Sequence, residues 1–380
     1  MATDRRDGFA LAIAMFAIVV IGAIIAGAFF ASGQEYRVGR NTITQARAMG
    51  AAEAGQASVL ARWNSAWNSS LPIGQATGWV DVPVNDGSGS AARANVTRLD
   101  QVTFWLVSEG AAGGTSVQTG SRRRTGSVLR LAIPQMNFLG ALTTRGTTQI
   151  GGSSYINGND AAPTGWTCPA AGPAMPGIAI DDATKIVTSG CNNLDCVSGD
   201  PKVLQTAEAA DDATYFDYET MGWSELVAMA TLRFDGSTNL QNLGPTTSGG
   251  ACNVADTKNW GEPKRNSPVH PCESYYPIIY VNGDMTLNTG RGQGILLVEG
   301  DLLVQGGFEF FGPVIVKGKL QTAGTGGHFN GGVMAANVDL ETNTVLGNAV
   351  VNYSSCALLT VLSNTSMPKL ATARGWADLF

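Results

Sequence analysis

Charged residues are scarce in this sequence. Asp, Glu, Lys and Arg make up only 14% of the 380 residues, where about a quarter is usual, and the formal net charge is −6. Nucleic-acid-binding proteins normally carry a basic surface, so we expect no nucleic-acid partner. Disorder requires low hydrophobicity together with a high net charge, and a hydrophobic content of 44% argues against it.

Residue patterns that bind metals or catalyse reactions are also missing. The chain has only two histidines, His270 and His328, and no CxxC pair. His270 lies between two prolines and His328 follows two glycines, so both are interpreted as loop or turn residues. We therefore expect no metal site, no cofactor, no catalytic residue and no enzymatic activity.

The six cysteines all lie far downstream of the apolar N-terminus. This placement indicates disulfides that form in an oxidising compartment. We prefer the pair Cys252–Cys272, which brackets a loop, and place Cys168–Cys191 next, with Cys196 as a further candidate. Cys356 falls in an inward-facing column of the repeat described below and is interpreted as a buried free thiol.

The N-terminus contains a long stretch with no charge at all. Residues 1–8 read MATDRRDG, and the next charged residue is Glu35. As a helix, the apolar segment 9–31 would be about 35 Å long, enough to span a hydrocarbon core of about 30 Å. A secretory signal peptide would have a shorter apolar centre, so we expect a retained membrane helix. Arg5 and Arg6 favour a cytoplasmic N-terminus.

A short leader that ends in glycine directly before an aromatic residue resembles the type III signal of prepilins, which prepilin peptidase cuts after the glycine. Here the junction is Gly8–Phe9. Residues 34–59 then resemble the stretch after the apolar helix in PilX-type minor pilins. The matching residues are Glu35, Arg37, Gly39, Asn41, Ala46 and the block Ala51-Ala52-Glu53-Ala54. Taken alone, this block is also ordinary helix-forming sequence.

The resemblance implies a minor pilin or pseudopilin that joins a type IV pilus-like filament. Such a protein is a single-pass inner-membrane protein with its bulk in the periplasm or at the cell surface. Its implied partners are other pilins and minor pilins, prepilin peptidase, the inner-membrane assembly platform and the membrane. Gly8 and Phe9 would serve processing, and the filament and membrane helix would use Phe9, Leu11, Ile13, Phe16, Gly22 and Gly27.

One position departs from the pattern of major pilins, which carry a glutamate five residues into the mature chain. In this sequence that position is Ile13. A carboxylate in lipid is costly unless it is paired, so its absence removes an electrostatic contact for stacking. Ile13 therefore suggests a minor, initiating or tip-located subunit.

The expected fold is α+β: a long N-terminal transmembrane helix, a small antiparallel sheet, and a mainly-β domain that ends in a β-solenoid. The helix is predicted to continue to about Trp67, before Pro72 and Gly74. Four strands follow at 79–83, 94–99, 102–109 and 127–133, separated by turn signals. The basic run at 122–124 is interpreted as a solvated loop.

A repeat begins at Ile278. The positions Gly283, Gly300, Gly318, Ala336 and Ser354 are spaced 17, 18, 18 and 18 residues apart. Apolar residues recur at most positions two and four before and after them, although Asn352 breaks one of these columns. Such alternation turns one face of a strand inward, and a fixed period stacks successive strands. Coils of 17–18 residues predict a β-solenoid, which weakly resembles bactofilins; a β-sandwich of hairpins is the alternative.

The remaining segments are assigned by their residue composition. Residues 138–159 resemble the repeat and are predicted to be the first coil or two, followed by an excursion that contains a helix at 218–233. The expected divisions are a prepilin leader at 1–8, the pilin helix at 9–75, the antiparallel sheet at 76–135, the first coils at 136–160, a disulfide-bearing insertion at 161–277, the solenoid at 278–362 and a tail at 363–380.

Two other functions remain open from the sequence. One is a membrane-anchored carbohydrate-binding or carbohydrate-active solenoid, and the other is a bactofilin-like scaffold that polymerises through its coils. Asp284, Asp301 and Lys319 occupy equivalent positions in the repeat. We interpret them as a solvated outer ladder that discourages edge pairing, in preference to a catalytic row.

Overall fold

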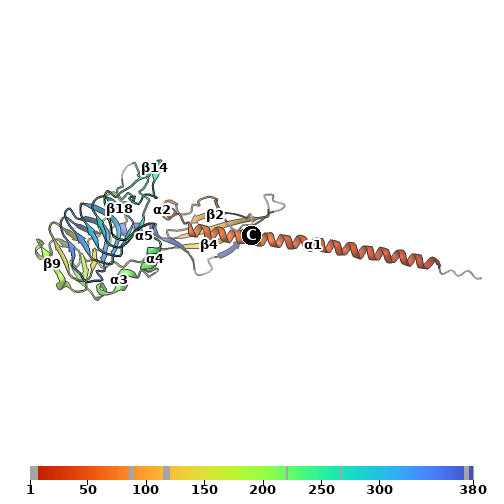
Figure 1. The fold of residues 1–380 in the computed structure, drawn as a ribbon, viewed down its shortest axis with the longest axis horizontal. Helices are drawn as coiled ribbons and strands as arrows, with labels where there is room; N and C mark the ends of the chain where they lie inside the picture. Colours follow the sequence, from red (N-terminus) through yellow and green to blue (C-terminus); the bar gives the residue numbers. More distant parts are fainter. Residues whose placement is uncertain are drawn as a thin grey trace, which may run out of the picture.

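The molecule is elongated, and three parts follow one another along one axis (Figure 1). The computed structural model describes residues 7–84, 90–113, 120–219, 221–265, 268–371 and 376–379. A long helix leads into an antiparallel sheet, and a larger region of parallel strands lies beyond the end of the helix. The expected α+β class is confirmed. The basic pair at 5–6 lies outside the described residues.

Helix α1 comprises Asp7–Ala61, and no proline interrupts its 55 residues. It ends before the predicted limit near Trp67, because Trp63 turns into the protein core. There the Trp63 ring packs on Phe104 with ring centroids 5.2 Å apart, and its Nε1 donates a hydrogen bond to Asn68 Oδ1 at 2.8 Å. A short second helix, α2 (Trp67–Ser70), follows.

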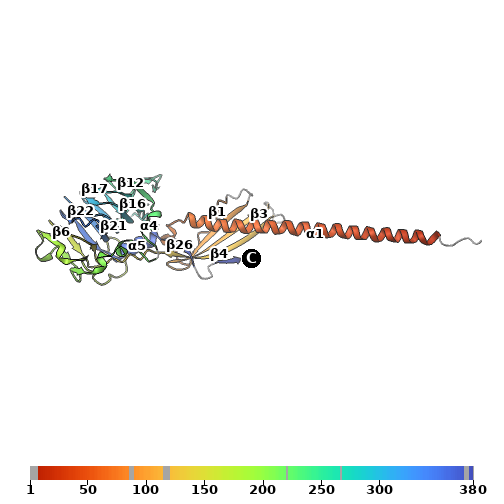
Figure 2. The same ribbon diagram turned by 60° about the horizontal axis from the view of Figure 1, so that its bottom comes forward.

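An antiparallel sheet lies along the second half of α1 (Figure 2). Its first four strands are β1 (Val80–Val82), β2 (Ala91–Arg98), β3 (Thr103–Ala112) and β4 (Ser121–Ala132), paired in that order. Each overlaps one of the predicted strands. The basic run 122–124 lies in β4, so its assignment to a loop is wrong. β3 is longer than predicted, and its extension pairs with this part of β4, with Gly110 opposite Arg123.

Small residues allow α1 and the sheet to approach closely. Ala48, Ala51 and Ala52 of α1 are buried, whereas Glu53 faces solvent. On β3, a Cβ atom at Gly110 would lie only 2.0 Å from the Ala48 carbonyl oxygen. The alanine-rich block after the apolar segment therefore serves tight helix-on-sheet packing.

The C-terminus returns to this sheet. β26 (Met367–Leu370) and β27 (Trp376–Leu379) both pair antiparallel with β4, and Met367 lies opposite Ala132. The segment predicted as a tail thus completes the sheet, and all residues between 132 and 367 form an insertion into it. We call α1's second half together with this sheet the head, and the insertion the parallel β region.

The parallel β region contains many short strands and few helices. Its strands are β5 (Leu142–Thr144), β6 (Thr148–Gly151), β7 (Tyr155–Asn157), β8 (Ile178–Ile180), β9 (Ile186–Ser189), β10 (Val197–Ser198), β11 (Val203–Gln205), β12 (Leu232–Asp235), β13 (Thr238–Leu240), β14 (Thr247–Ser248), β15 (Ala251–Cys252), β16 (Ile278–Asn282), β17 (Met285–Leu287), β18 (Arg291–Gln293), β19 (Ile295–Val298), β20 (Leu302–Val304), β21 (Phe308–Val316), β22 (Leu320–Thr322), β23 (Gly327–Ala335), β24 (Asn343–Val345) and β25 (Val350–Tyr353). Its α-helices are α3 (Asp212–Phe216), α4 (Trp223–Ala228) and α5 (Ser355–Thr365), and its 3-10 turns are η1 (Ala183–Lys185), η2 (Asn192–Leu194) and η3 (Ala207–Ala210).

Two parallel sheets share one apolar core. One runs β10-β7-β25-β23-β21-β19-β16-β12 and the other β13-β17-β20-β22-β24-β6-β9. The chain passes from one sheet to the other between consecutive strands, for example from β16 to β17 and from β19 to β20. Buried side chains of both sheets, such as Val281 of β16 and Met285 of β17, belong to the same cluster.

The first three repeats, around Gly283, Gly300 and Gly318, pair in the register that the sequence predicts. Ile279 pairs with Leu296 and Leu296 with Val314, and on the facing sheet Met285 pairs with Leu302. The close packing of the turns explains why a small residue is needed at this aligned position: a Cβ at Gly300 would lie 2.2 Å from Asp284 Oδ1. The spacing of 17–18 residues therefore reflects strands that do stack in parallel.

The register then slips, so the predicted fourth and fifth members are wrong. Val314 pairs with Val333, one residue beyond the predicted partner Gly332. Beyond β22 a longer turn delays the next strand to β24, which leaves Val338 and Leu340 exposed. In the fifth repeat, Ser354 accepts a hydrogen bond from the Ala357 N–H and caps α5, so its apolar residues lie on a helix and not on a strand.

The stacking order also differs from the prediction. The segment 138–159 does not precede Ile278 in the stack, because β5 pairs with β23 on one side and β8 on the other. Strands from within 161–277 belong to the same two sheets, with β12 beside β16. Of the helix predicted at 218–233, only α4 forms, and Leu232 pairs with Ile279 in the sheet.

Three disulfides join the six cysteines. Cys252 pairs with Cys272, which is the pair that the sequence favours. The Cys168–Cys191 pair is wrong: Cys168 pairs with Cys356 and ties its loop to α5, and Cys191 pairs with Cys196 across the η2 turn. Cys356 is buried, as expected, but it is not a free thiol.

Candidate functional site

The first half of α1 is the most unusual surface of the molecule. It projects away from the head (Figure 1), and none of its most apolar window is buried. This helix is long and apolar enough to cross a membrane. The side chains of Phe9, Ile13 and Phe16 are 74%, 57% and 71% exposed. An isolated soluble chain would not keep such a continuous apolar surface in water.

The residues predicted for the filament and membrane helix all lie on this first half of α1. Leu11 is exposed, and no atom lies within 4 Å of where a Cβ would stand on Gly22 or Gly27. They are spread along the exposed half of the helix. Gly8 lies in α1, but its surroundings are outside the described residues.

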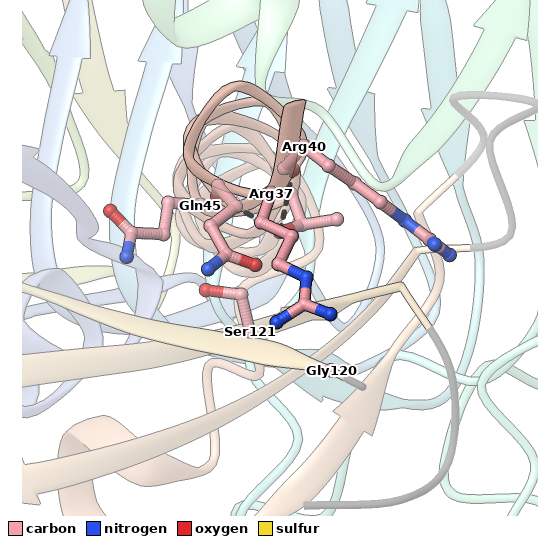
Figure 3. Close-up of a pocket in the computed structure, with 7 residues that line it drawn as sticks. Arg37, Arg40, Gln45, Gly120 and Ser121 are labelled. Carbon is pink, nitrogen blue, oxygen red and sulfur yellow. Dashed lines mark hydrogen bonds between the residues drawn. The ribbon is translucent and has the colours of Figure 1, made fainter. Parts of the chain in front are cut away.

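A groove opens where α1 leaves the sheet (Figure 3). It has a volume of about 460 Å³. Its lining comes from two elements: α1 contributes Arg37, Arg40, Asn41, Thr44 and Gln45, and the chain at the start of β4 contributes Gly120 and Ser121. Figure 3 shows Arg37 extending from α1 toward Gly120 and Ser121, while Arg40 extends to one side of the groove. We call this feature the junction groove.

The junction groove continues the stripe of α1 that packs on the sheet. Residues three or four positions apart share one face of a helix. From Arg37 this face passes through Asn41 and Thr44 to Ala48 and Ala52, the last two of which are buried against β3. The stripe thus changes from small and apolar to polar and basic at the edge of the sheet, where β4 begins.

Hydrogen bonds order part of the groove but leave its basic groups available. The Thr44 hydroxyl donates to the carbonyl oxygens of Arg40 and Asn41, at 3.2 and 2.9 Å. Gln45 Oε1 accepts from Arg123 Nη2 at 3.0 Å. Both Arg37 and Arg40 are exposed, and neither forms an ion pair with a carboxylate in the part of the chain that the structure describes. Sequence reasoning missed this groove, although two arginines just beyond an apolar helix were visible.

A second basic cluster on the sheet is organised around one buried carboxylate. Glu109 is only 5% exposed and pairs with Arg93 at 2.8 Å and Arg124 at 2.6 Å. Burial by itself would raise the pKa of Glu109, but hydrogen bonds and charges from Arg124 and Arg93 outweigh it and hold the pKa below its ordinary value. Both guanidinium groups also lie over the Trp79 ring. This cluster therefore links β2, β3 and β4.

The acidic ladder of the parallel β region is also structural. Asp284 Oδ1 accepts the Asp301 N–H at 2.9 Å, and Asp301 Oδ1 accepts the Lys319 N–H at 3.0 Å. Lys319 also pairs with Asp301 at 3.3 Å and contacts Glu341. Among the described residues, no group of three or more His, Cys, Asp or Glu side chains is placed to hold a metal ion. The ladder therefore links successive turns.

Comparisons with known proteins give little information about the function of this chain. No family model matches it, and no curated protein does. Among solved structures, the competence-associated pilin ComZ from Thermus thermophilus aligns over 88% of this chain and 97% of its own, with 12% identity and a TM-score of 0.24. Values this low do not assign a fold or a function, so a functional assignment has to come from the residues and geometry of this chain.

Proposed function

We propose that this chain is a minor pilin or pseudopilin. The single observation that carries the proposal is the division of α1 into two halves with opposite surroundings. Its second half packs closely on an antiparallel sheet through Ala48, Ala52 and Gly110, and its first half is apolar and exposed. A helix built in this way is suited to anchor a subunit in a membrane and later to pack among similar helices in a filament core.

Packing among helices in an apolar environment depends on close approach, which small residues allow. Gly22 and Gly27 supply such positions on the exposed half. Their lack of neighbours within the described chain is consistent with neighbours supplied by other subunits. Proposed partners are therefore other pilins and minor pilins.

Processing follows from the same assignment. Prepilin peptidase would cut between Gly8 and Phe9 on the cytoplasmic side of the inner membrane, and the head would lie on the opposite side. The assembly platform would then extract the helix into the filament.

The architecture further favours a place at or near the tip. The parallel β region lies beyond the C-terminal end of α1 (Figures 1 and 2), where it would occupy space along the axis of the subunit. Ile13 also lacks the carboxylate that would pair with a neighbour. We interpret the parallel β region, whose parallel strands stack in two facing sheets, as a β-solenoid that is displayed for binding or adhesion.

Filament incorporation tests the proposal. In cells that carry the matching assembly system, Gly8→Glu should leave the protein in the membrane and remove it from the sheared filament fraction. Gly39→Ala is the matched control, because a Cβ there meets no atom within 4 Å, and it should appear in filaments like the wild type. Filament fractions that contain the Gly8→Glu protein at wild-type levels would refute the assignment.

A further inference from the structure

We propose that the junction groove binds the phosphate of an anionic phospholipid headgroup while the subunit is anchored in the membrane. The ligand would come from the leaflet at the C-terminal end of the apolar segment. This inference rests on the membrane anchoring in the proposed function and adds a specific lipid site to it. It is carried by the chemistry, the position and the size of the groove.

The chemistry of the groove suits a phosphate monoanion or diester. Arg37 and Arg40 are three residues apart on one face of α1, and the guanidinium group presents a planar fork of donors that matches phosphate oxygens. Asn41 and the Ser121 hydroxyl can donate further hydrogen bonds. Among the described residues, no carboxylate lines the groove. The lining therefore attracts an anion without a competing negative charge.

The position along α1 matches the headgroup layer. Arg37 is six residues beyond the end of the apolar segment at Ala31, or about 9 Å along the helix axis. Helical side chains lean toward the N-terminus, and long arginine side chains extend several ångströms toward a membrane interface. The headgroup layer on each side of the hydrocarbon core is roughly 5–8 Å thick. The Arg37 guanidinium can thus reach lipid phosphates.

The structure favours a lipid over the other anions that arginines bind. A volume of about 460 Å³ exceeds the space of a lone phosphate and accommodates a headgroup. In the part of the chain that is described, no aromatic side chain lines the groove to stack nucleobases, and the whole chain carries a net charge of −6. The groove also opens just beyond the end of the apolar segment, so a lipid is the nearest source of phosphate.

The test uses the full chain in a neutral detergent with equal amounts of phosphatidylglycerol and phosphatidylcholine. Native mass spectrometry then reports which lipid is retained. We expect the wild type to retain phosphatidylglycerol preferentially. Arg37→Gln/Arg40→Gln should reduce that preference at least roughly tenfold, because it removes both charged hydrogen-bond donors to the phosphate. The lysine double variant, Arg37→Lys/Arg40→Lys, should give an intermediate value, because it keeps the charge but loses the fork.

Arg62→Gln is the matched control, because Arg62 is an exposed arginine directly after the C-terminal end of α1 and does not line the groove. It should retain phosphatidylglycerol like the wild type. Equal retention by the wild type and the Arg37→Gln/Arg40→Gln protein would overturn the proposal. Millimolar inorganic phosphate that displaces the lipid completely would overturn the lipid assignment and identify a free-phosphate site. Failure of the proposed function is separately visible, because an anchored but uncleaved chain would still show the lipid preference.

Discussion

The contact between Gly110 and α1 gives a sharp test of how the head is built. In Gly110→Ala, the new Cβ would lie 2.0 Å from the Ala48 carbonyl oxygen and 2.4 Å from the Ala52 amide nitrogen. Both are backbone atoms of a helix and cannot rotate away. Ordinary contact begins at 3.4 Å, so α1 must move from β3 by about 1.4 Å.

This displacement sets the expected cost. A gap of 0.5–1 Å already removes about a quarter to a half of the dispersion attraction between atoms in contact. The buried Ala48, Ala51 and Ala52 would lose most of their contacts with the sheet. We expect Gly110→Ala to destabilise the head by roughly 3–5 kcal/mol, at or above the usual range for overpacking. Gly50→Ala is the control: it sits on the same helix with no atom within 4 Å of a Cβ, and should stabilise it by about 0.5–1 kcal/mol.

Hydrogen exchange measured by mass spectrometry on the full chain resolves the two halves of the molecule. Each 1.4 kcal/mol changes the exchange rate by about tenfold where exchange follows opening of the head. Peptides from β2 to β4 should exchange at least about a hundredfold faster in Gly110→Ala, while β16 to β25 stay unchanged. Exchange in β2 to β4 within about threefold of the wild type would refute the packing argument.

Two further predictions concern cross-links and charge. Replacing Cys168 and Cys356 by serine removes a link across 188 residues and should cost about 5 kcal/mol by loop-closure entropy, against about 2 kcal/mol for Cys191 and Cys196, which are five apart; chemical unfolding of the two double variants gives the comparison. Glu109→Gln should destabilise the head by roughly 1–2 kcal/mol at neutral pH, because its arginine partners stay partly solvated. Because the folded-state pKa of Glu109 is lowered, this difference should persist above the ordinary glutamate range and vanish as pH falls through the folded pKa; a pH-independent difference in unfolding midpoints would contradict it.

The elements that sequence predicts well are those with a local periodic cause. The apolar run of α1 needs no tertiary partner to be recognised. The columns through Ile279, Leu296 and Val314 follow from alternation within a strand and a constant coil length. Both patterns depend on residues that are near one another in the chain.

The sequence does not reveal the register slip, because an alignment of residues at a fixed spacing requires turns of constant length. One extra residue before Val333 and a longer turn before β24 break the spacing, while Val338 and Leu340 still look like column members. The sequence of α5 also contains a helical signal, because Leu358, Val361 and Leu362 recur at three- and four-residue spacing after a serine cap. The fixed spacing of the repeat outweighs this signal in the prediction.

The stacking order depends on a long-range constraint. Because Met367 pairs with Ala132, the chain enters and leaves the parallel β region at the same place. The first strand after entry, β5, therefore lies beside β23, near the exit, and the chain reaches β12 and β16 only later. Nothing in the sequence of 138–159 alone indicates which neighbour it takes. The junction groove is likewise a product of assembly, because Arg37 and Ser121 come together only when β4 lies along α1.

The mass of the mature N-terminus is the most direct test of the pilin assignment. The protein should be isolated from cells with an active prepilin peptidase and from matched cells without it, and its N-terminal peptide measured by mass spectrometry. We expect a chain that begins at Phe9 in the first case and retains residues 1–8 in the second. A chain that begins at Met1 or Ala2 in peptidase-positive cells would contradict the assignment.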